Sequence, residues 1–454
     1  MSLSHLNLAQ QSEPYGAVNA NLLEALRTPL FEQRGRLIGA VGTTLRVRGV
    51  RARIGDLVEI LDASDHGSKD NLGAEVVGFE GDDLLLTPLG DLRGLSSNVD
   101  VVLREMADRV PAHEGLLGRV LNARGLPIDG LGRVAPGPES PLVAPPPSPM
   151  DRRAISQPLE SGIRALDGLL TLGEGQRMGI FAAAGGGKST LLAMLARRAK
   201  ADAIVIGMIG ERGREVPEFI EDALGEEGLS RSVVVVATSD QPAMERVRAA
   251  RAATAIAEGF RSQGKHVLLL MDSVTRYARA LREIGLAAGE PAVRRGLPPS
   301  VFAELPRLFE RAGSDANGAI TALYTVLTEG EEEDPVAEEV RSLLDGHIIL
   351  SRSLGARGHY PAIDVARSQS RLFRKLAGTG QIAAAEAVRA MLAKLEDIEM
   401  LVQMGEYQRG SDPLADAALD QREAIERFLR QKPNEASDSA TTLARLRAIG
   451  ETIL

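Results

Sequence analysis

The chain of 454 residues contains no cysteine and no tryptophan, and its only aromatic residues are five tyrosines and nine phenylalanines. The lack of cysteine excludes disulfide bonds, thiolate metal sites and cysteine nucleophiles, and it fits a reducing cytoplasm. So few aromatic side chains do not provide a platform for stacking nucleic-acid bases. The net charge of −9 also repels a phosphate backbone, so we expect no nucleic-acid partner.

Long hydrophobic runs are missing as well. The longest runs, such as Val267–Met271, have the length of a buried strand and are far too short to span a membrane. The segment Met1–Gly16 is polar and lacks the basic-then-apolar pattern of a secretion signal. We therefore expect a cytoplasmic protein whose contact with any membrane is peripheral.

The order of apolar runs and turn residues predicts three domains. Residues 30–100 have the short strands and close turns of a small β domain, a barrel. A proline-rich stretch, Ala135–Pro149, is expected to be an extended, exposed connector. After Arg371 the chain becomes alanine-rich and helical. The expected domains are an N-terminal β-barrel with a leading segment (1–98), an α/β domain (99–365) and a C-terminal helical domain (366–454).

The middle domain alternates strands with helices, as in a mostly parallel sheet covered on both faces. In such a sheet the loops at the carboxyl ends of the strands carry the chemistry. In the last domain, Val388, Met391, Leu395, Ile398 and Val402 recur at helical spacing, which indicates the core face of a helix. The expected strands are Met178–Phe181, Ala203–Ile209, Val233–Ala237, Val267–Met271 and Ile320–Val326.

A glycine-rich segment, Phe-Ala-Ala-Ala-Gly-Gly-Gly-Lys-Ser-Thr at 181–190, joins the first of these strands to a helix. Consecutive glycines leave backbone N–H groups free to face an anion, Lys188 can reach the β- and γ-phosphates, and the Ser189 hydroxyl can hold Mg²⁺. The pattern departs from the usual P-loop only at Ala182, which is compatible with a negative φ. The expected ATP-binding residues of the loop are Ala184, Gly185, Gly186, Gly187, Lys188, Ser189 and Thr190.

Two carboxylates follow apolar strands near this loop. Asp272 ends the strand that begins at His266, where an acidic residue can hold a water of the Mg²⁺ shell, although aspartate also caps many strand ends. Glu211 follows Ala203–Ile209, where a carboxylate can orient and polarise a water for attack on the γ-phosphate. Arg212 is expected to steady Glu211 or to approach the γ-phosphate. Charged runs of this kind also occur as solvated faces.

A third cluster, between Asp345 and Arg371, combines arginines with a Tyr-Pro turn. An arginine supplied by an adjoining subunit stabilises the charge of a transferring phosphoryl group. The residues alone do not choose between Arg352, Arg367 and Arg371. His347 and His359 lack a second ligand at zinc spacing, which favours structural hydrogen bonding for both.

Taken together, these segments resemble the hexameric rotary-type ATPases related to the catalytic β subunit of ATP synthase and, among them, the type III protein-secretion ATPases. The loop Ala182–Ala184 and the segment Gly173–Leu192 are more similar to the injectisome branch than to the flagellar branch. The resemblance covers nearly the whole chain and is carried by Phe181–Thr190, Gly210–Glu215, Met271–Tyr277, Leu286–Gly289, Arg294–Ala312, Thr325–Gly330, Leu344–Ser351, His359–Asp364 and Gly405–Pro413.

The resemblance implies a RecA-like P-loop ATPase core and a role for each matching residue. Lys188 and Ser189 bind phosphate and Mg²⁺, Glu211 is the catalytic carboxylate with Arg212 beside it, and Asp272 is the second Mg²⁺ residue. Arg371 is the arginine given to the neighbouring subunit's site. Two tyrosines form the adenine pocket, Tyr360 packing on the base and Tyr407 completing it. The implied cofactors are ATP and Mg²⁺.

The resemblance also implies an assembly, a homohexamer at the cytoplasmic face of the inner membrane. Its implied partners are central stalk and peripheral stator proteins, chaperone–effector complexes and the membrane export gate. ATP hydrolysis would release export substrates from their chaperones and help to unfold them.

Four other functions fit the sequence less well. A flagellar export ATPase shares nearly every motif and is the main alternative. A proton-translocating rotary ATPase subunit shares the core chemistry, but Arg294–Ala312 and Gly405–Pro413 are of the secretion type. A RecA-type RNA translocase conflicts with the acidic charge and the scarcity of aromatic residues. A non-enzymatic scaffold has no use for Lys188, Glu211 and Asp272 together.

Overall fold

The computed structural model describes residues 33–61, 72–104, 108–183, 185–328 and 334–452. The chain divides into two compact units, one made of residues 1–88 and 92–106 and the other of residues 89–91 and 107–454.

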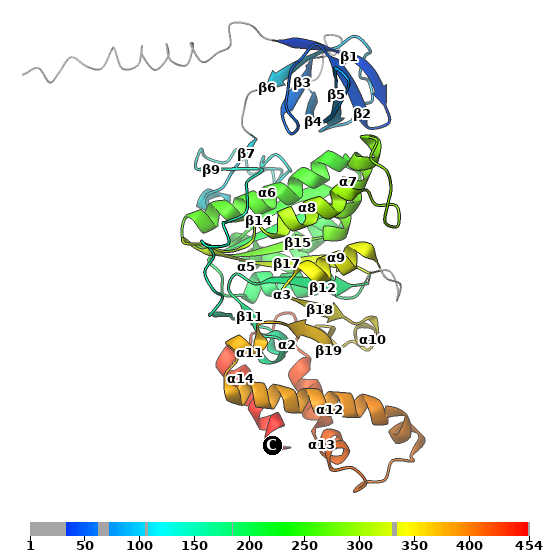
Figure 1. Ribbon diagram of the computed structural model, residues 1–454. Helices are drawn as coiled ribbons and strands as arrows, with labels where there is room; N and C mark the ends of the chain where they lie inside the picture. The colour runs from blue at the N-terminus through cyan, green and yellow to red at the C-terminus, as the bar shows by residue number, and fades with distance from the viewer. Residues whose placement is uncertain (1–32, 62–71, 105–107, 184, 329–333, 453–454) are drawn as a thin grey trace, which may run out of the picture. The chain divides into compact units, whose positions relative to one another are not determined.

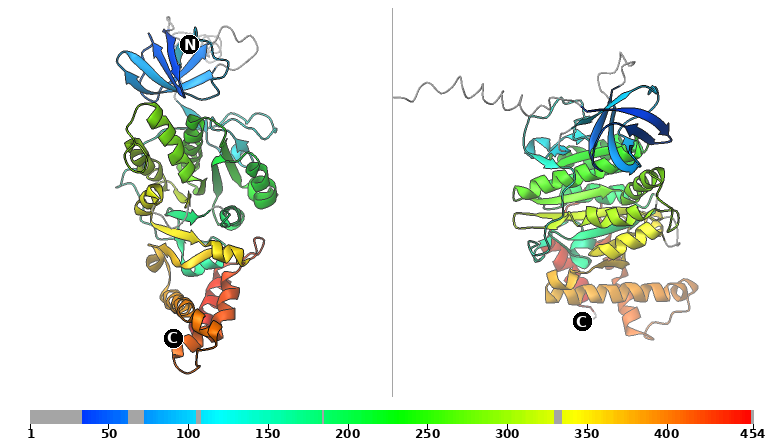
Figure 2. Two further views of the ribbon diagram at one scale, coloured as in Figure 1. Left: turned by 90° about the vertical axis from the view of Figure 1, so that its right-hand side faces the viewer. Right: turned by 45° about the horizontal axis from the view of Figure 1, so that its top comes forward.

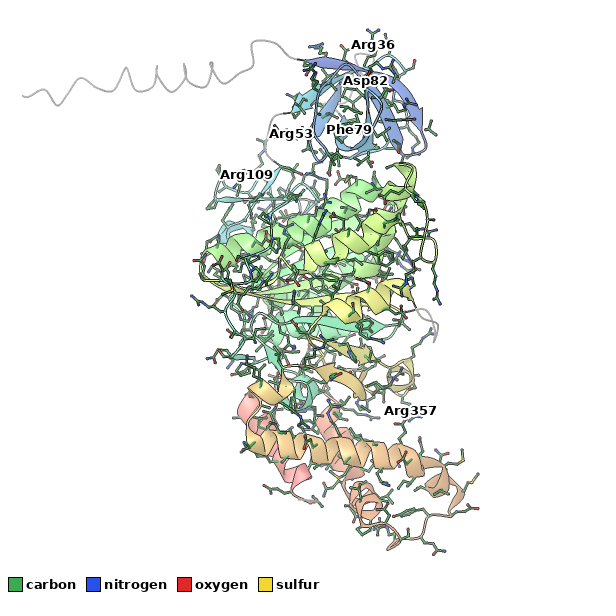
Figure 3. The ribbon with its side chains drawn as sticks, in the orientation of Figure 1. Arg36, Arg53, Phe79, Asp82, Arg109 and Arg357 are labelled. Atoms are coloured by element: carbon green, nitrogen blue, oxygen red, sulfur yellow. The ribbon has the colours of Figure 1, made fainter. Side chains whose placement is uncertain are left out.

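The first unit is a closed barrel of six strands in the order β1-β2-β5-β4-β3-β6. Alternating residues of β1 point inward and outward, so Leu37 is buried while Arg36 is exposed, and the exposed side chains Arg36 and Phe79 are drawn in Figure 3. This confirms the predicted small barrel. The last strand of the barrel, however, lies beyond residue 98, the predicted end of the N-terminal domain. The strands are β1 (Arg34–Val41), β2 (Thr44–Arg48), β3 (Leu57–Leu61), β4 (Leu72–Glu80), β5 (Asp83–Pro88) and β6 (Asp100–Arg104).

The second unit is built on a nine-stranded sheet in the order β19-β18-β12-β17-β15-β13-β14-β8, with β16 paired to β17 outside this path. The strands from β18 to β8 run parallel, while β19 and β16 are antiparallel to their neighbours. The five predicted strands all form, within two residues at each end. The strands are β8 (Val120–Leu121), β12 (Arg177–Ala182), β13 (Ala203–Glu211), β14 (Ser232–Thr238), β15 (His266–Asp272), β16 (Gly313–Ser314), β17 (Ala319–Leu327), β18 (Gly346–Leu350) and β19 (Ile363–Ser370).

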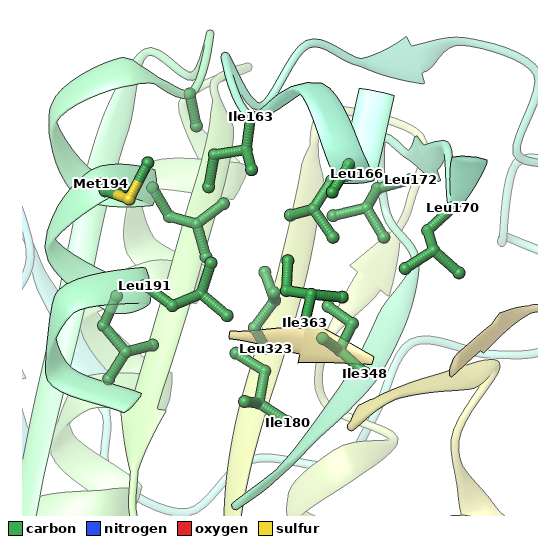
Figure 4. Packing of buried hydrophobic residues seen from close by; sticks show 14 of the residues in the cluster. Ile163, Leu166, Leu170, Leu172, Ile180, Leu191, Met194, Leu323, Ile348 and Ile363 are labelled. Carbon is green, nitrogen blue, oxygen red and sulfur yellow. The ribbon is translucent and has the colours of Figure 1, made fainter. Parts of the chain in front are cut away.

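Helices cover both faces of this sheet, which explains why the central strands are apolar throughout. On one face α2 and α3 pack on the strands, and Leu166 of α2 and Leu191 of α3 belong to one buried cluster with Ile180 of β12 (Figure 4). On the other face α6 packs on β13, β14 and β15 (Figure 1). The helices of this part are α2 (Arg164–Leu169), α3 (Lys188–Arg198), α4 (Glu215–Glu218), η2 (Phe219–Leu224), α5 (Gly225–Ser230), α6 (Ala243–Ser262), α7 (Val274–Ala287), α8 (Pro299–Phe309), α9 (Pro335–Leu343) and α10 (Arg352–Ala356).

The C-terminal helices gather beside α2 and the β19 edge of the sheet (Figure 2). The helix α12 carries the predicted core face, in which Val388, Met391 and Ile398 are buried while Leu395 and Val402 are half-buried, and it ends at Gly405 in the left-handed conformation (φ 73°). The remaining helices are α11 (Phe373–Leu376), α12 (Thr379–Met404), α13 (Pro413–Leu429) and α14 (Ser439–Gly450). Among the described residues, no helix is both long enough and apolar enough to cross a bilayer.

The proline-rich connector differs from the expectation in one respect. Most of Ala135–Pro149 is exposed, but β9 (Glu139–Pro141) pairs with β7 (Arg109–Pro111), and Leu142 is fully buried. The buried Arg311 side chain explains this anchoring, because its Nη1 donates a hydrogen bond of 2.8 Å to the Leu142 carbonyl. The remaining short elements are η1 (Glu114–Leu116), β10 (Pro158–Leu159) and β11 (Leu172–Gly173).

Candidate active site

The glycine-rich loop connects the carboxyl end of β12 to the amino end of α3. Gly185 and Gly187 adopt positive φ values of 75° and 82°, which the loop needs in order to turn back on itself. Ser189 and Thr190 lie in the first turn of α3, at the positive end of its dipole. This geometry is that of an anion cradle. Ala184, which was expected to bind phosphate, lies outside the described residues.

The side chain of Lys188 extends from this loop to two carboxylates. Its Nζ lies 2.6 Å from Oδ1 of Asp272 and 3.3 Å from Oε1 of Glu211. The three side chains are only 7–12% exposed, so water screens their charges little. Asp272 is the last residue of β15 and Glu211 the last residue of β13. The parallel sheet therefore brings the predicted lysine and both predicted carboxylates together at the carboxyl ends of its strands.

The electrostatic environment of Glu211 suits proton transfer near neutral pH. Burial and the negative charge of Asp272 raise its pKa from 4.5 to about 7, although Lys188 opposes the shift. Burial works to lower the pKa of Lys188, but the attraction of Asp272 and Glu211 outweighs it, so that pKa is raised. Lys188 therefore stays protonated near neutral pH, while Glu211 can take up or release a proton there.

A break in the regular pairing of β13 precedes Glu211. The pairing of β13 with β14 shifts register between Ile209 and Glu211, and Gly210 has a φ of 72°. A Cβ added at Gly210 would lie 2.9 Å from the Cβ of Arg276, so only glycine lets β13 pass this close to α7. The guanidinium of Arg276 acts to lower the pKa of Glu211, which places a second cation near this carboxylate.

Two residues of this site were not singled out from the sequence. Arg276 could have been noticed as the fourth residue after Asp272, in the first turn of the following helix. Thr325, whose Oγ1 donates a hydrogen bond of 2.7 Å to Oδ1 of Asp272, gave no signal of its own because it lies within an apolar strand. By contrast, the predicted Arg212 is exposed and lies 3.6 Å from Glu215.

The two tyrosines expected at the adenine lie in different surroundings. A Cβ added at Gly187 would be 3.2 Å from Cε1 of Tyr360, so this ring lies against the phosphate loop, and it is 36% exposed. The hydroxyl of Tyr407 instead donates to Oδ1 of Asp416 at 3.0 Å, in the first turn of α13. Among the described residues, the hydrogen bonds of Tyr407 go to Leu401, Asp412 and Asp416 and not to the phosphate loop, so its role in an adenine pocket stays a prediction.

Arg371 lies near the amino end of β12, whereas the phosphate loop follows the carboxyl end of that strand. Its backbone N donates to the Asp345 carbonyl at 3.0 Å, and Asp345 N donates to the carbonyl of Arg177, the first residue of β12, at 2.8 Å. The phosphate loop follows the last residue of β12, five residues later, which is a distance of roughly 16 Å along the strand. Arg371 is exposed, and its backbone therefore lies beside the first residue of β12, at the far end of that strand from the cradle of its own chain.

The other members of this cluster are also placed by the structure. Arg352 begins α10, directly after β18, and Arg367 lies within β19; both are exposed. His347 makes a structural hydrogen bond of 3.1 Å to the Arg367 carbonyl. His359 is buried, and its Nε2 has no hydrogen-bond partner within the part of the chain that the structure describes.

The donor set at the loop fits Mg²⁺. Ser189 supplies a hydroxyl and Asp272 a carboxylate, which are oxygen ligands of the kind that this ion prefers, and Mg²⁺ usually takes its other ligands from phosphate and water. Lys188 is the cation that can meet a bound nucleotide's phosphates.

Family comparisons agree with this geometry. The nucleotide-binding domain of the ATP synthase alpha/beta family matches residues 162–370, and the C-terminal domain of the type III secretion ATPase EscN matches residues 377–448. The type 3 secretion system ATPase of Xanthomonas euvesicatoria is 53% identical over 416 residues, covering 91% of this chain and 93% of that protein. A flagellum-specific ATP synthase of Pseudomonas aeruginosa is 45% identical and covers 99% of both chains.

Solved structures give the same result. The assembled ATPase EscN of the enteropathogenic E. coli type III secretion system has a TM-score of 0.86 and 44% identity, covering 92% of this chain and 100% of that one. EscN in complex with its central stalk EscO has a TM-score of 0.84 over the same shares. The predicted RecA-like core, N-terminal barrel and C-terminal helices are confirmed. The chain belongs to the family of type 3 secretion system ATPases.

Proposed function

We propose that this chain hydrolyses ATP with Mg²⁺ to power protein secretion, and that the Lys188–Glu211–Asp272 cluster is its catalytic centre. The observation that carries the proposal is the placement of Lys188 Nζ within 3.3 Å of both carboxylates, directly at the phosphate loop. This cluster contains a cation for phosphate, a carboxylate for the metal and a carboxylate for water, which are the parts that phosphoanhydride hydrolysis needs.

Each residue then has one task. Lys188 and the N–H groups of residues 184–190 bind the β- and γ-phosphates, and Tyr360 packs on adenine, with Tyr407 completing the pocket. Ser189 and Asp272 hold Mg²⁺, which neutralises developing charge when it is bound. Glu211 takes the proton of the attacking water, and its pKa of about 7 is close to the optimum for a general base at neutral pH. Arg212, which is exposed beside Glu211, approaches the γ-phosphate, and Arg371 completes the site of a neighbouring subunit.

The assembly proposed for this chain is a homohexamer with the three domains expected from the sequence. It acts in the cytoplasm, at the inner-membrane export gate, and contacts a central stalk, a peripheral stator and chaperone–effector complexes. The solved EscN structures, one of them with its central stalk EscO, support a ring with a stalk. Sequential hydrolysis around the ring would release secretion substrates from their chaperones and unfold them for export.

The flagellar export ATPases remain the second candidate. The injectisome branch is favoured by identities of 50–53% to three type 3 secretion relatives, against 44–45% to two flagellar ones. Purification of the chain from its native host, followed by mass spectrometry of the partners, distinguishes the branches: flagellar export proteins among them would overturn the assignment.

The variant Glu211→Gln tests the catalytic centre. It removes the base while keeping the shape of the side chain, so ATP binding should stay within severalfold and kcat should fall roughly a hundredfold or more. Glu218→Gln, which changes an exposed glutamate of α4, is the matched control and should keep wild-type activity. A Glu211→Gln enzyme with a normal kcat would show that another group activates the water. Loss of ATP binding instead would assign Glu211 to the nucleotide or its metal.

A further inference from the structure

Thr325 connects the Asp272 carboxylate to the strand beside the phosphate loop. Its Oγ1 donates to Oδ1 of Asp272 at 2.7 Å, and the same oxygen is 2.6 Å from Nζ of Lys188. Thr325 is fully buried. One carboxylate oxygen thus has two donors, of which one is a long, flexible lysine and the other a short side chain on a rigid strand.

The sheet order explains how Thr325 comes to this position. Its strand, β17, lies between β12 and β15. Tyr324 pairs with Met271, so the next residue of each strand, Thr325 and Asp272, lie side by side. Thr325 also pairs with Ile180 of β12, and like Leu323 two residues earlier it faces the α3 side of the sheet.

The two donors on Oδ1 respond differently to a nucleotide. Lys188 is the cation of the phosphate loop, and a bound nucleotide draws it towards the phosphates. The Thr325 hydroxyl is a neutral donor on a short, fully buried side chain, so a nucleotide does not draw it away from Asp272 and it keeps its position. After Lys188 leaves, the Thr325 hydroxyl is the donor that still orients the carboxylate.

We propose that Thr325 is a positioning residue that holds Oδ1 of Asp272 so that the carboxylate keeps the orientation for Mg²⁺ when Lys188 moves to the phosphates. The inference rests on the proposed role of Asp272 as a Mg²⁺ residue. It predicts that the hydroxyl of Thr325 affects the Mg²⁺ dependence of nucleotide binding while leaving the metal-free binding unchanged.

The experiment compares Thr325→Ser, which keeps the hydroxyl, with Thr325→Ala, which differs from it by that one oxygen. Binding of a fluorescent ATP analogue is titrated with and without Mg²⁺. A hydrogen bond to a charged group is worth about tenfold or more in an equilibrium constant. Thr325→Ala should therefore need roughly tenfold more Mg²⁺ for half-maximal tightening of binding, whereas Thr325→Ser should behave like the wild type.

Thr321→Val is the matched control for a general loss of stability. Thr321 lies on the same strand and faces the same side, is also fully buried, and its hydroxyl contacts Gly175 N and His266 Nε2, each at 2.8 Å, away from Asp272. This variant should leave the Mg²⁺ dependence unchanged. An equal shift in Thr321→Val would show that the effect is only structural and would overturn the proposal.

Asp272→Asn separates failure of this inference from failure of the proposed function. If Asp272→Asn weakens the effect of Mg²⁺ and Thr325→Ala does not, the inference about Thr325 is wrong while the role of Asp272 stands. If Asp272→Asn leaves the Mg²⁺ dependence unchanged, the metal assignment of Asp272 is wrong and the inference falls with it.

Discussion

The Nζ of Lys188 lies 2.6 Å from Oδ1 of Asp272, so the lysine of the phosphate loop is already ion-paired within its own chain. Both side chains are largely buried, and a buried charge is costly unless it has a partner. In the proposed function, the phosphates of an entering nucleotide replace the carboxylate as the partner of Lys188. The binding free energy is therefore the difference between two ion-paired states, and it does not contain the full attraction between lysine and phosphate.

Lys188→Ala should remove most of the nucleotide affinity and all turnover while the protein remains folded. It should also lower the melting temperature, because Glu211 and Asp272 then repel each other without the lysine between them. The loss should be larger at pH 8 than at pH 6, where Glu211 is mostly protonated. Nucleotide binding, circular dichroism and thermal melts at both pH values test this. A folded variant with wild-type affinity would contradict the assignment of the phosphate cradle.

The pH dependence of stability should reveal the raised pKa of Glu211. Between its ordinary value of 4.5 and about 7, the folded state keeps a proton that the unfolded chain has released. Raising the pH through this window therefore lowers the free energy of unfolding, by about 3 kcal/mol for a shift of this size. Glu211→Gln has no such proton to lose, so its melting temperature relative to wild type should rise from pH 5 to pH 8.

The control for the pH experiment is Glu218→Gln, which should follow the wild type throughout the range because the side chain is exposed. A constant difference between Glu211→Gln and wild type from pH 5 to pH 8 would mean that Glu211 is ionised over the whole range in the folded protein.

Arg371 should act on the site of a neighbouring subunit, because it lies near the amino end of β12 and its own phosphate loop follows the carboxyl end. Arg371→Ala and Lys188→Ala should each be nearly inactive as pure proteins. When they are mixed before assembly, an interface that combines an intact Lys188 with an intact Arg371 is wild type, and part of the ATPase activity should return.

Native mass spectrometry must show that mixed rings form in this experiment. Mixed rings without any recovered activity would indicate either strict sequential firing around the ring or action of Arg371 within its own chain. Arg352→Ala and Arg367→Ala in the same scheme show whether another arginine of the cluster has this role.

Arg164 should hold the C-terminal helices to the rest of the second unit. It is only 2% exposed, and its guanidinium donates to the Phe428 carbonyl at 2.8 Å, to the Arg430 carbonyl and to Glu435. Arg164→Met leaves these acceptors without their donor and should cost about 3 kcal/mol, the range for breaking a buried ionic group. Thermal melts and limited proteolysis measure the loss.

The matched control for Arg164→Met is Arg427→Met. Arg427 is an exposed arginine of α13 whose pair with Glu423 is worth little. Equal melting temperatures for the two variants would show that the Arg164 contacts do not stabilise the docking of these helices.

The local pattern of the sequence was enough to predict the strands, the barrel, the phosphate loop and the two carboxylates. Apolar runs of strand length bounded by turn residues are a local signal. Glu211 and Asp272 each stand at the end of such a run, and Lys188 follows the glycine-rich turn after another. Features that depend on residues far apart in the sequence could not be predicted from this local pattern. The barrel gains a strand beyond residue 98, and Leu142 is buried inside a segment that looked like an exposed connector, because each depends on a distant partner, namely β1 and β3 for the strand and Arg311 for Leu142.

The sequence by itself therefore determined which side chains stand at the ends of strands, since that order is a property of the chain. Only the tertiary structure decided which of them meet. The strand order β12-β17-β15-β13 is not the order of the sequence, and it brings Lys188 to Glu211 across 23 residues and Thr325 to Asp272 across 53. Long-range strand pairing determines these contacts, and it depends on packing of the whole sheet between its helices, which no local pattern contains.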